Sequence, residues 1–198
     1  DIYLKDLSQN SPEQRLTQTE ASERALAFSQ DSQALYFIAN RSGSNQVWRL
    51  PLKGGEALQV TDLPLPVEGF KVAADGKTLA LALSVLPDCN TLKCTVDAKA
   101  AEQERKDSAL VYDSLMVRHW DHWRTPYRSQ LHVAPLGEGR VTVAKNLISE
   151  WDTDIAGMDQ VAFTPDNQHI VFSAKAPGVD QAWHTNYDIF QVSINGGE

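Results

Sequence analysis

Short apolar runs recur along the chain, and each follows the same kind of polar turn. The pattern is an apolar residue, small residues, an Asp in a polar turn and an apolar run, found in residues 28–39, 72–82 and 163–174. The Asp, with Gly or Asn after it in two of the three units, favours a tight turn, because these residues tolerate positive φ or bond their own backbone. The apolar run that follows is typical of a short strand buried on both faces.

A second pattern, in which apolar and polar residues alternate, follows these runs. It occurs in residues 1–7, 46–56, 130–136 and 188–198. Alternation indicates a more exposed strand, and the Gly-Gly pair that ends two of these segments favours a hairpin turn. Leu16-Thr17 and Val60-Thr61 mark the next strand in two of the units.

Equivalent positions lie about 45 residues apart, as Tyr3 and Trp48 do. Four short strands with this period are typical of β-propeller blades, which bury their faces by stacking on one another. An immunoglobulin-like sandwich also has short strands, but it does not require its strand groups to be similar. The repeat therefore predicts an all-β fold, a β-propeller of four-stranded antiparallel blades forming a partial ring of about three to four blades.

The spacing of the patterns divides the chain into blades. We expect a part-blade over residues 1–18, a blade over 25–62, a blade over 67–147 with an insertion at 87–115, and a part-blade over 155–198. Residues 97–107, rich in strong helix formers, predict one short helix in the insertion. A solvated decoration is its simpler interpretation, but long loops often line ligand or partner surfaces.

The positions at which the repeat starts and stops also predict something about the chain as a whole. Both fall inside blades, and the chain opens on Asp1 without a Met or a signal-peptide pattern. We therefore expect an excised piece of a larger ring, whose uncovered blade faces lead it to self-associate.

Charge and hydropathy exclude two classes of partner. The chain carries 18 basic and 26 acidic residues, a formal net charge of −8, and its basic residues are scattered. A nucleic-acid surface needs clustered Lys and Arg, so we expect no nucleic-acid partner. No apolar run approaches the roughly 18 to 20 residues that span a bilayer, so we expect no membrane segment.

The two cysteines, Cys89 and Cys94, lie close together in the predicted insertion. A local disulfide closing a loop tip predicts a periplasmic or secreted protein. Two unrelated thiols, with a cytoplasmic protein, remain the alternative. A zinc site lacks a second Cys or His pair at ligand spacing, so we expect neither metal nor cofactor.

Two sets of residues carry a family resemblance. Residues 28–31 and 40–43, with Trp48 and Gly54-Gly55, resemble the TolB-type propeller repeat. Residues 116–131, which read M-V-R-H-W-D-H-W-R-T-P-Y-R-S-Q-L, resemble a more specific segment, R-H-W-D-x-W followed by R-S-x-L. That segment occurs in bacterial members of the prolyl oligopeptidase family called acylaminoacyl peptidases or dipeptidyl aminopeptidases. The Asp-Cys and Cys-Thr pairs resemble exported members of that group.

The resemblance implies the N-terminal propeller of a serine peptidase that cleaves short peptides. In such enzymes the propeller covers the active site and restricts entry, and a C-terminal α/β-hydrolase domain carries the catalytic triad on a G-x-S-x-G turn. This chain has no G-x-S-x-G motif, so we expect no catalytic residues in it and no activity of its own. Its implied partners are the hydrolase domain of the parent chain and short peptide substrates.

Two other functions stay open at this point. One is a TolB-like propeller that binds proteins without enzymatic activity. The other is a self-contained lyase or glycan-binding propeller, for which the sequence offers no dedicated residues.

The densest group of chemically reactive side chains is R-H-W-D-H-W-R, residues 118–124. On a single strand, His119, Asp121 and Trp123 would share one face. His119 and Asp121 alone are too few ligands for a metal ion. The simpler interpretation is structural, with the tryptophans packed between blades and the Asp and His side chains hydrogen-bonded nearby.

Two sets of charged residues are candidates for contacts with a peptide. The first is Arg118, Arg124 and Arg128. A guanidinium can pair with a peptide carboxylate, so these are the candidate substrate-binding residues. The second set is Glu13, Glu20 and Glu23. Carboxylates can bind the amine of a substrate, but a solvated loop is the simpler interpretation for these residues.

Overall fold

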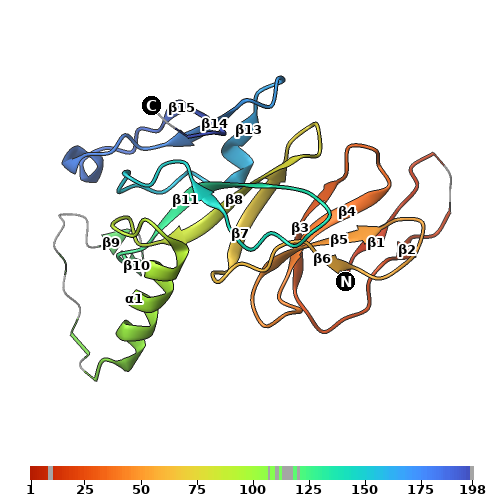
Figure 1. Cartoon of the computed structure of the whole chain (residues 1–198), viewed down its shortest axis with the longest axis horizontal. Coiled ribbons are helices and arrows are strands. Elements are labelled where there is room, and N and C mark those ends of the chain that lie inside the picture. The colour runs from red at the N-terminus through yellow and green to blue at the C-terminus, as the bar shows by residue number, and fades with distance from the viewer. Residues whose placement is uncertain (9–10, 107, 110–111, 113–117, 120, 197–198) are drawn as a thin grey trace.

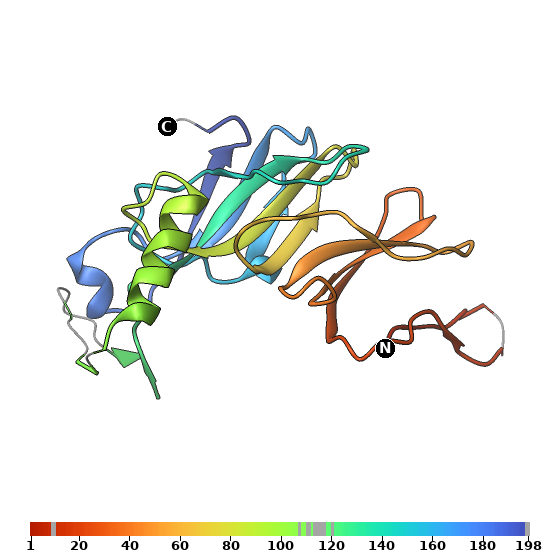
Figure 2. The same cartoon turned by 60° about the horizontal axis from the view of Figure 1, so that its bottom comes forward.

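The chain forms a curved row of small antiparallel sheets that stand side by side (Figure 1, Figure 2). The computed structural model describes residues 1–8, 11–106, 108–109, 112, 118–119 and 121–196. The row begins with a two-stranded sheet of β1 (Tyr3–Leu4) and β2 (Gln14–Arg15). Next comes the four-stranded sheet β3 (Glu23–Phe28), β4 (Ala34–Ala39), β5 (Gln46–Pro51) and β6 (Leu58–Gln59).

The row continues with a second four-stranded sheet and a three-stranded one. The former contains β7 (Val67–Val72), β8 (Thr78–Val85), β11 (Arg128–Pro135) and β12 (Lys145–Asn146). The latter contains β13 (Val161–Phe163), β14 (His169–Ala174) and β15 (Asp188–Ser193). Neighbouring strands within each sheet are antiparallel. The predicted all-β fold with antiparallel blades and one α-helix is confirmed for the described residues.

The apolar runs of the sequence form the second strand of each blade. All six residues of β4 are buried. Leu35 and Phe37 pack with Ile2 of the preceding sheet, whereas Tyr36 and Ile38 pack with residues of the following sheet. This alternation follows from the period of two along a strand, and it explains why a strand between two neighbours is apolar throughout.

The turns before these strands have a shared geometry. Oδ1 of Asp31 accepts hydrogen bonds from Ser29 Oγ and Gln33 N, at 2.6 and 3.0 Å. The same bonds hold Asp166, and Asp75 accepts one from Lys77 N. The residue after each Asp has a positive φ, between 53° and 69°, which Asn and Gly tolerate best.

Buried amide side chains join each blade to the linker that leads to the next. The Gln46 side chain donates to Leu63 O at 3.1 Å, and its Oε1 accepts from Thr61 Oγ1 at 2.7 Å. In the next blade Gln130 occupies the equivalent place, donating to Trp151 O and accepting from Asn146 Nδ2. These bonds satisfy polar groups that stacking would otherwise bury without partners.

The connection from β8 to β11 holds a helix and a hairpin. Helix α1 (Leu92–Glu104) begins before the predicted segment 97–107, because the Thr91 side chain caps it by accepting from Cys94 N at 3.2 Å. Strands β9 (Arg118–His119) and β10 (His122–Trp123) pair antiparallel. The interpretation of 118–124 as one strand was wrong, because Arg118–His119 and His122–Trp123 are two strands that pair antiparallel.

His132, in the middle of β11, generates a prediction about pH. It is 1% exposed, its Nδ1 lies 3.0 Å from Gln130 O, and burial lowers its pKa from 6.5 to about 4. Between these values the unfolded chain binds a proton that the folded chain excludes. Stability is therefore fully present above about pH 6.5 and falls as the pH drops toward 4, by at most about 1.4 kcal/mol per pH unit.

We predict that His132→Gln flattens this dependence, whereas His122→Gln, at an exposed position, leaves it intact. Urea unfolding of the three proteins between pH 4 and 7 measures the slopes. An unchanged slope in His132→Gln would show that His132 does not cause the acid sensitivity.

Candidate functional site

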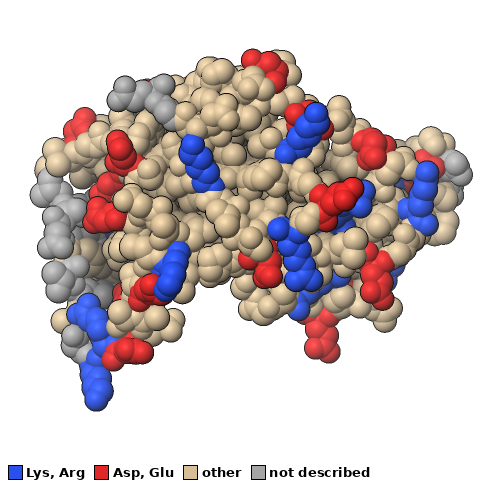
Figure 3. Space-filling view, viewed as in Figure 1, with Lys and Arg blue, Asp and Glu red and all other residues tan. Residues whose placement is uncertain are grey.

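The two ends of the blades differ in what they carry. Because neighbouring strands are antiparallel, the connections β4–β5, β8–β11 and β14–β15 all leave the blades at the same end. We call this the insertion end, and define it by residues 40–45, 86–127 and 175–187. The opposite end carries the Asp turns. Acidic and basic side chains are interspersed over the face of the molecule that Figure 3 shows.

Arg128 stands at the insertion end, as the first residue of β11. It is 5% exposed, and its Nη1 donates to Thr125 O at 2.7 Å and to Tyr127 O at 2.9 Å. Its Nε lies 2.7 Å from Oδ1 of Asp152, a contact that acts through charge because the N–H does not form a hydrogen bond. Arg128 therefore ties the end of the insertion to the linker before the next blade.

Arg124 lies close to Arg128 but has a different environment. It is half-buried, and burial and the Arg128 charge lower its pKa, while the Asp152 and Asp154 carboxylates act in the opposite direction. Arg118 lies on β9 and is exposed, with its guanidinium carbon 5.7 Å from the centre of the Trp123 ring. The structure thus brings Arg124 and Arg128 together and places Arg118 on the hairpin.

A line of hydrogen bonds crosses the blades next to this pair. Asp154 accepts from Ser129 N at 2.7 Å, and Ser129 Oγ donates to the Glu68 carboxylate at 2.6 Å. Arg24, on the preceding blade, donates to Glu68 O at 2.7 Å. Both Arg24 and Glu68 lie at β-bulges, which redirect side chains near the ends of strands. Sequence reasoning missed Arg24, Glu68, Asp152 and Asp154, which have no signal in the repeat.

Helix α1 is joined to the segments on either side of it. Tyr127 Oη donates to Glu102 of α1 at 2.8 Å, and Lys99 Nζ lies 4.6 Å from the Tyr127 ring centre. Burial, with the Glu102 hydrogen bond, raises the pKa of Tyr127 to about 12. A disulfide joins Cys89 to Cys94, in the first turn of the helix. Helix α1 is therefore held at both ends, by the disulfide at its start and by Tyr127 near its end.

The hairpin contradicts the structural interpretation for one tryptophan. Trp123 is 59% exposed rather than packed between blades, because the hairpin projects beyond the stacked sheets. Trp120 and the side chain of His119 lie outside the described residues. Asp121 Oδ1 is 3.1 Å from His122 Nε2, and both side chains are exposed. Among the residues the structure describes, no three His, Cys, Asp or Glu side chains form a metal-binding group.

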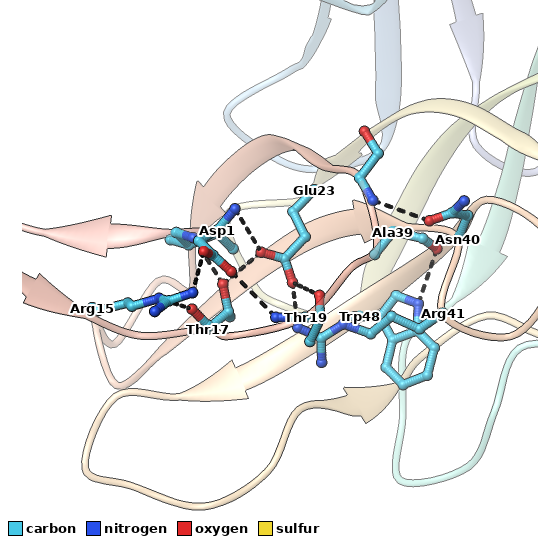
Figure 4. Close-up of polar contacts among 11 residues, drawn as sticks. Asp1, Arg15, Thr17, Thr19, Glu23, Ala39, Asn40, Arg41 and Trp48 are labelled. Atoms are coloured by element: carbon cyan, nitrogen blue, oxygen red, sulfur yellow. Dashed lines mark hydrogen bonds and ion pairs between the residues drawn. The ribbon is translucent and has the colours of Figure 1, made fainter.

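Glu23 was expected in a solvated loop, and that interpretation was wrong (Figure 4). Its carboxylate is fully buried and accepts from Thr17 Oγ1 at 2.5 Å, Thr19 Oγ1 at 3.3 Å and the Arg41 guanidinium. Burial alone would raise the pKa of Glu23, but the bonds from Thr17 and Arg41 outweigh it and lower the pKa. With these partners in place, Glu23 is not available to bind the amine of a substrate.

The Arg41 side chain completes this buried cluster. Its guanidinium carbon lies 5.1 Å from the Phe37 ring centre and 5.6 Å from that of Trp48. Glu13 and Glu20 are exposed, as expected, and Glu13 pairs with Lys5 at 3.3 Å. The Glu23–Arg41 pair is a structural contact within the β3–β6 sheet, and the hydrogen bonds from Thr17 and Thr19 join it to the segment that leads from the first sheet.

Comparison with known proteins identifies the type of fold. No protein-family model matches the chain. It superimposes on acylaminoacyl peptidase from Pyrococcus horikoshii with a TM-score of 0.59 and 12% identity, covering 96% of this chain and 26% of that one. TolB from Acinetobacter baumannii gives a TM-score of 0.51 and 16% identity, covering 93% of this chain and 33% of that one. The fold is therefore a partial β-propeller of the kind found in TolB and in peptidases.

Sequence comparison shows that the chain is related to peptidases in particular. The chain is 27% identical to dipeptidyl-peptidase 5 of Porphyromonas endodontalis over 176 residues, which are 85% of this chain and 24% of that protein. It is 24% identical to dipeptidyl-peptidase 5 of Porphyromonas gingivalis over 193 residues, 94% of this chain and 27% of that protein. The chain is a propeller segment related to these peptidases, and it spans about a quarter of their length. No described helix is long and apolar enough to cross a membrane.

We predict that Glu23→Gln lowers the free energy of unfolding by about 3 kcal/mol, because it leaves the Arg41 charge buried without its counter-charge. Glu13→Gln, at the exposed Lys5 pair, should change it by less than about 1 kcal/mol. Chemical denaturation monitored by circular dichroism measures both. Equal stability of the Glu23→Gln and Glu13→Gln variants would contradict a buried ion pair.

Proposed function

We propose that this chain is the gating propeller of a serine peptidase that cleaves short peptides, acting as an acylaminoacyl or dipeptidyl peptidase. The observation that carries the proposal is the match to dipeptidyl-peptidases, which extends over 85% of the chain or more in two relatives. The propeller would cover the active site, and its partner would be a hydrolase domain of the same parent chain.

The distribution of residues supports this division of labour. The chain has no G-x-S-x-G turn, so a serine nucleophile of this type must come from elsewhere in the parent protein. The insertion end carries the features suited to contact with a partner or a peptide: helix α1, Arg124, and exposed Trp123 and Trp183. The opposite end carries the Asp turns, the β5–β6 connection and the longer β11–β12 connection, residues 136–144.

The coding sequence around this segment provides the first test. We predict a G-x-S-x-G motif at a strand-to-helix turn downstream of Glu198, and Ser→Ala there should abolish hydrolysis of a dipeptide p-nitroanilide by the intact protein. The 198-residue chain alone should give no turnover. An intact protein that binds proteins but hydrolyses no peptide would instead be a TolB-like interaction propeller.

Gating makes a separate prediction for the intact enzyme. Its kcat/KM should fall steeply when the same cleavage site is placed in a peptide of about 30 residues, because the propeller restricts access. Glu23→Gln, which loosens a blade contact, should narrow the difference between short and long substrates, and Glu13→Gln should not. Equal kcat/KM for both lengths in the unmodified enzyme would refute gating.

The disulfide supports a periplasmic or secreted location, because such bonds persist in oxidising compartments. Labelling with a thiol reagent in intact cells tests this. Unreactive Cys89 and Cys94 that become reactive after reduction fit export, and free thiols before reduction contradict it.

We also propose that the isolated chain self-associates through its terminal blade faces. Tyr3 on β1 is 58% exposed and Ile189 on β15 is 79% exposed, in the first and last sheets of the row, where a further blade would stack. Light scattering at micromolar concentration should give at least a dimer, and Ile189→Lys should reduce association more than Val143→Lys, on an exposed loop. A strictly monomeric mass would refute the proposal.

A further inference from the structure

Arg124 is a half-buried cation without a hydrogen-bond or ion-pair partner among the described residues. The other arginines of comparable or greater burial in this region are engaged. Arg128 donates to two carbonyls and lies against Asp152, and Arg41 pairs with Glu23. Withdrawing a guanidinium from water without a partner is costly, so an unpaired one calls for an explanation.

The neighbouring carboxylates do not supply the missing partner. Asp152 is in contact with Arg128 at 2.7 Å, and Asp154 accepts the Ser129 amide at 2.7 Å. Both lie near enough to stabilise the Arg124 charge, but neither forms an ion pair with it. The guanidinium fork, with its parallel N–H groups, is left to recognise an oxygen pair from outside the chain.

Position and local charge narrow the chemical class of that ligand. Arg124 directly follows the exposed Trp123 and lies at the insertion end, where a ligand has access. Arg124 and Arg128 lie near the Asp152 and Asp154 carboxylates there. The two carboxylates disfavour a doubly charged anion such as phosphate, whereas one planar carboxylate matches the fork in shape and adds a single negative charge.

We propose that Arg124 is a binding residue for the C-terminal carboxylate of a short peptide. The identity of the ligand as a peptide rests on the proposed function. Of the three candidate arginines, the structure favours this one, because Arg128 is engaged by the blade and Arg118 is stacked on Trp123. A main-chain carboxylate is present only where a peptide chain ends. Arg124 would therefore bind a peptide whose C-terminus lies at this position more tightly than one whose chain continues past it.

Titration of the 15N-labelled chain followed by NMR tests the proposal with three forms of one N-acetylated tripeptide. The free acid should shift the Arg124 Nε–H and Trp123 indole resonances. The C-terminal amide should bind at least about tenfold more weakly, because the charge-assisted hydrogen bonds are lost. An amidated form with one Glu side chain should bind like the amide, and inorganic phosphate more weakly than the free acid.

Arg124→Gln should weaken binding of the free acid at least about tenfold. Arg124→Lys keeps the charge without the fork, so its affinity for the free acid should lie between those of the unmodified chain and Arg124→Gln. It serves as the test if the Gln variant does not fold. Arg140→Gln, at an exposed residue 3.7 Å from Asp62 toward the opposite end, is the matched control.

Three results would overturn the proposal. The first is equal binding of the free acid and the amide, and the second is undiminished binding of the free acid to Arg124→Gln. The third is binding of the Glu-containing amide as tightly as the free acid, which would assign the site to side-chain carboxylates. A downstream G-x-S-x-G motif would still support the proposed function in each case, so the two failures are distinguishable.

Discussion

Each blade has two apolar faces, and neither can be covered by the blade itself. The second strand of a blade therefore supplies side chains to both neighbours. In β8, Leu79, Leu81 and Leu83 pack toward the preceding sheet, whereas Ala80 and Ala82 pack toward the following one. The small alanines leave room for Ile170 and Phe172 of the next sheet. This stacking of one sheet on the next organises the rest of the molecule.

Stacking constrains the faces of the blades but leaves their ends free to vary. The β4–β5 connection is a short turn, while the equivalent β8–β11 connection carries α1 and the β9–β10 hairpin. Polar groups that approach the stack must be satisfied, as in the Gln46 and Gln130 networks and the Glu23–Arg41 pair. At the insertion end, the half-buried Arg124 has no such partner among the described residues.

The sequence predicts the parts of the structure that repeat. Asp31, Asp75 and Asp166 mark turns because the same local hydrogen bonds form in each, and the apolar runs mark strands because both their faces are buried. The position of the helix start is less predictable, because the Thr91 cap and the docking of Leu92 and Val96 on the blade outweigh local propensity.

Features that depend on long-range contacts could not be read from the sequence. Glu23 is charged, yet Arg41 and two threonines from other segments make its burial possible. Trp123 is apolar, yet it lies on a hairpin that no blade covers. The three candidate arginines look alike in sequence. Only the placement of Asp152, Thr125 and Trp123 separates the engaged Arg128 and stacked Arg118 from Arg124.

Native-state hydrogen exchange tests most directly the claim that stacked blades stabilise one another. Amides of β4 and β8, each covered on both faces, should exchange only through unfolding of the whole stack, with similar free energies that depend on denaturant alike. Amides of the edge strand β15 should exchange through smaller openings. If β4 and β8 opened independently, at clearly different free energies, the sheets would be separate units and the account of mutual stacking would be wrong.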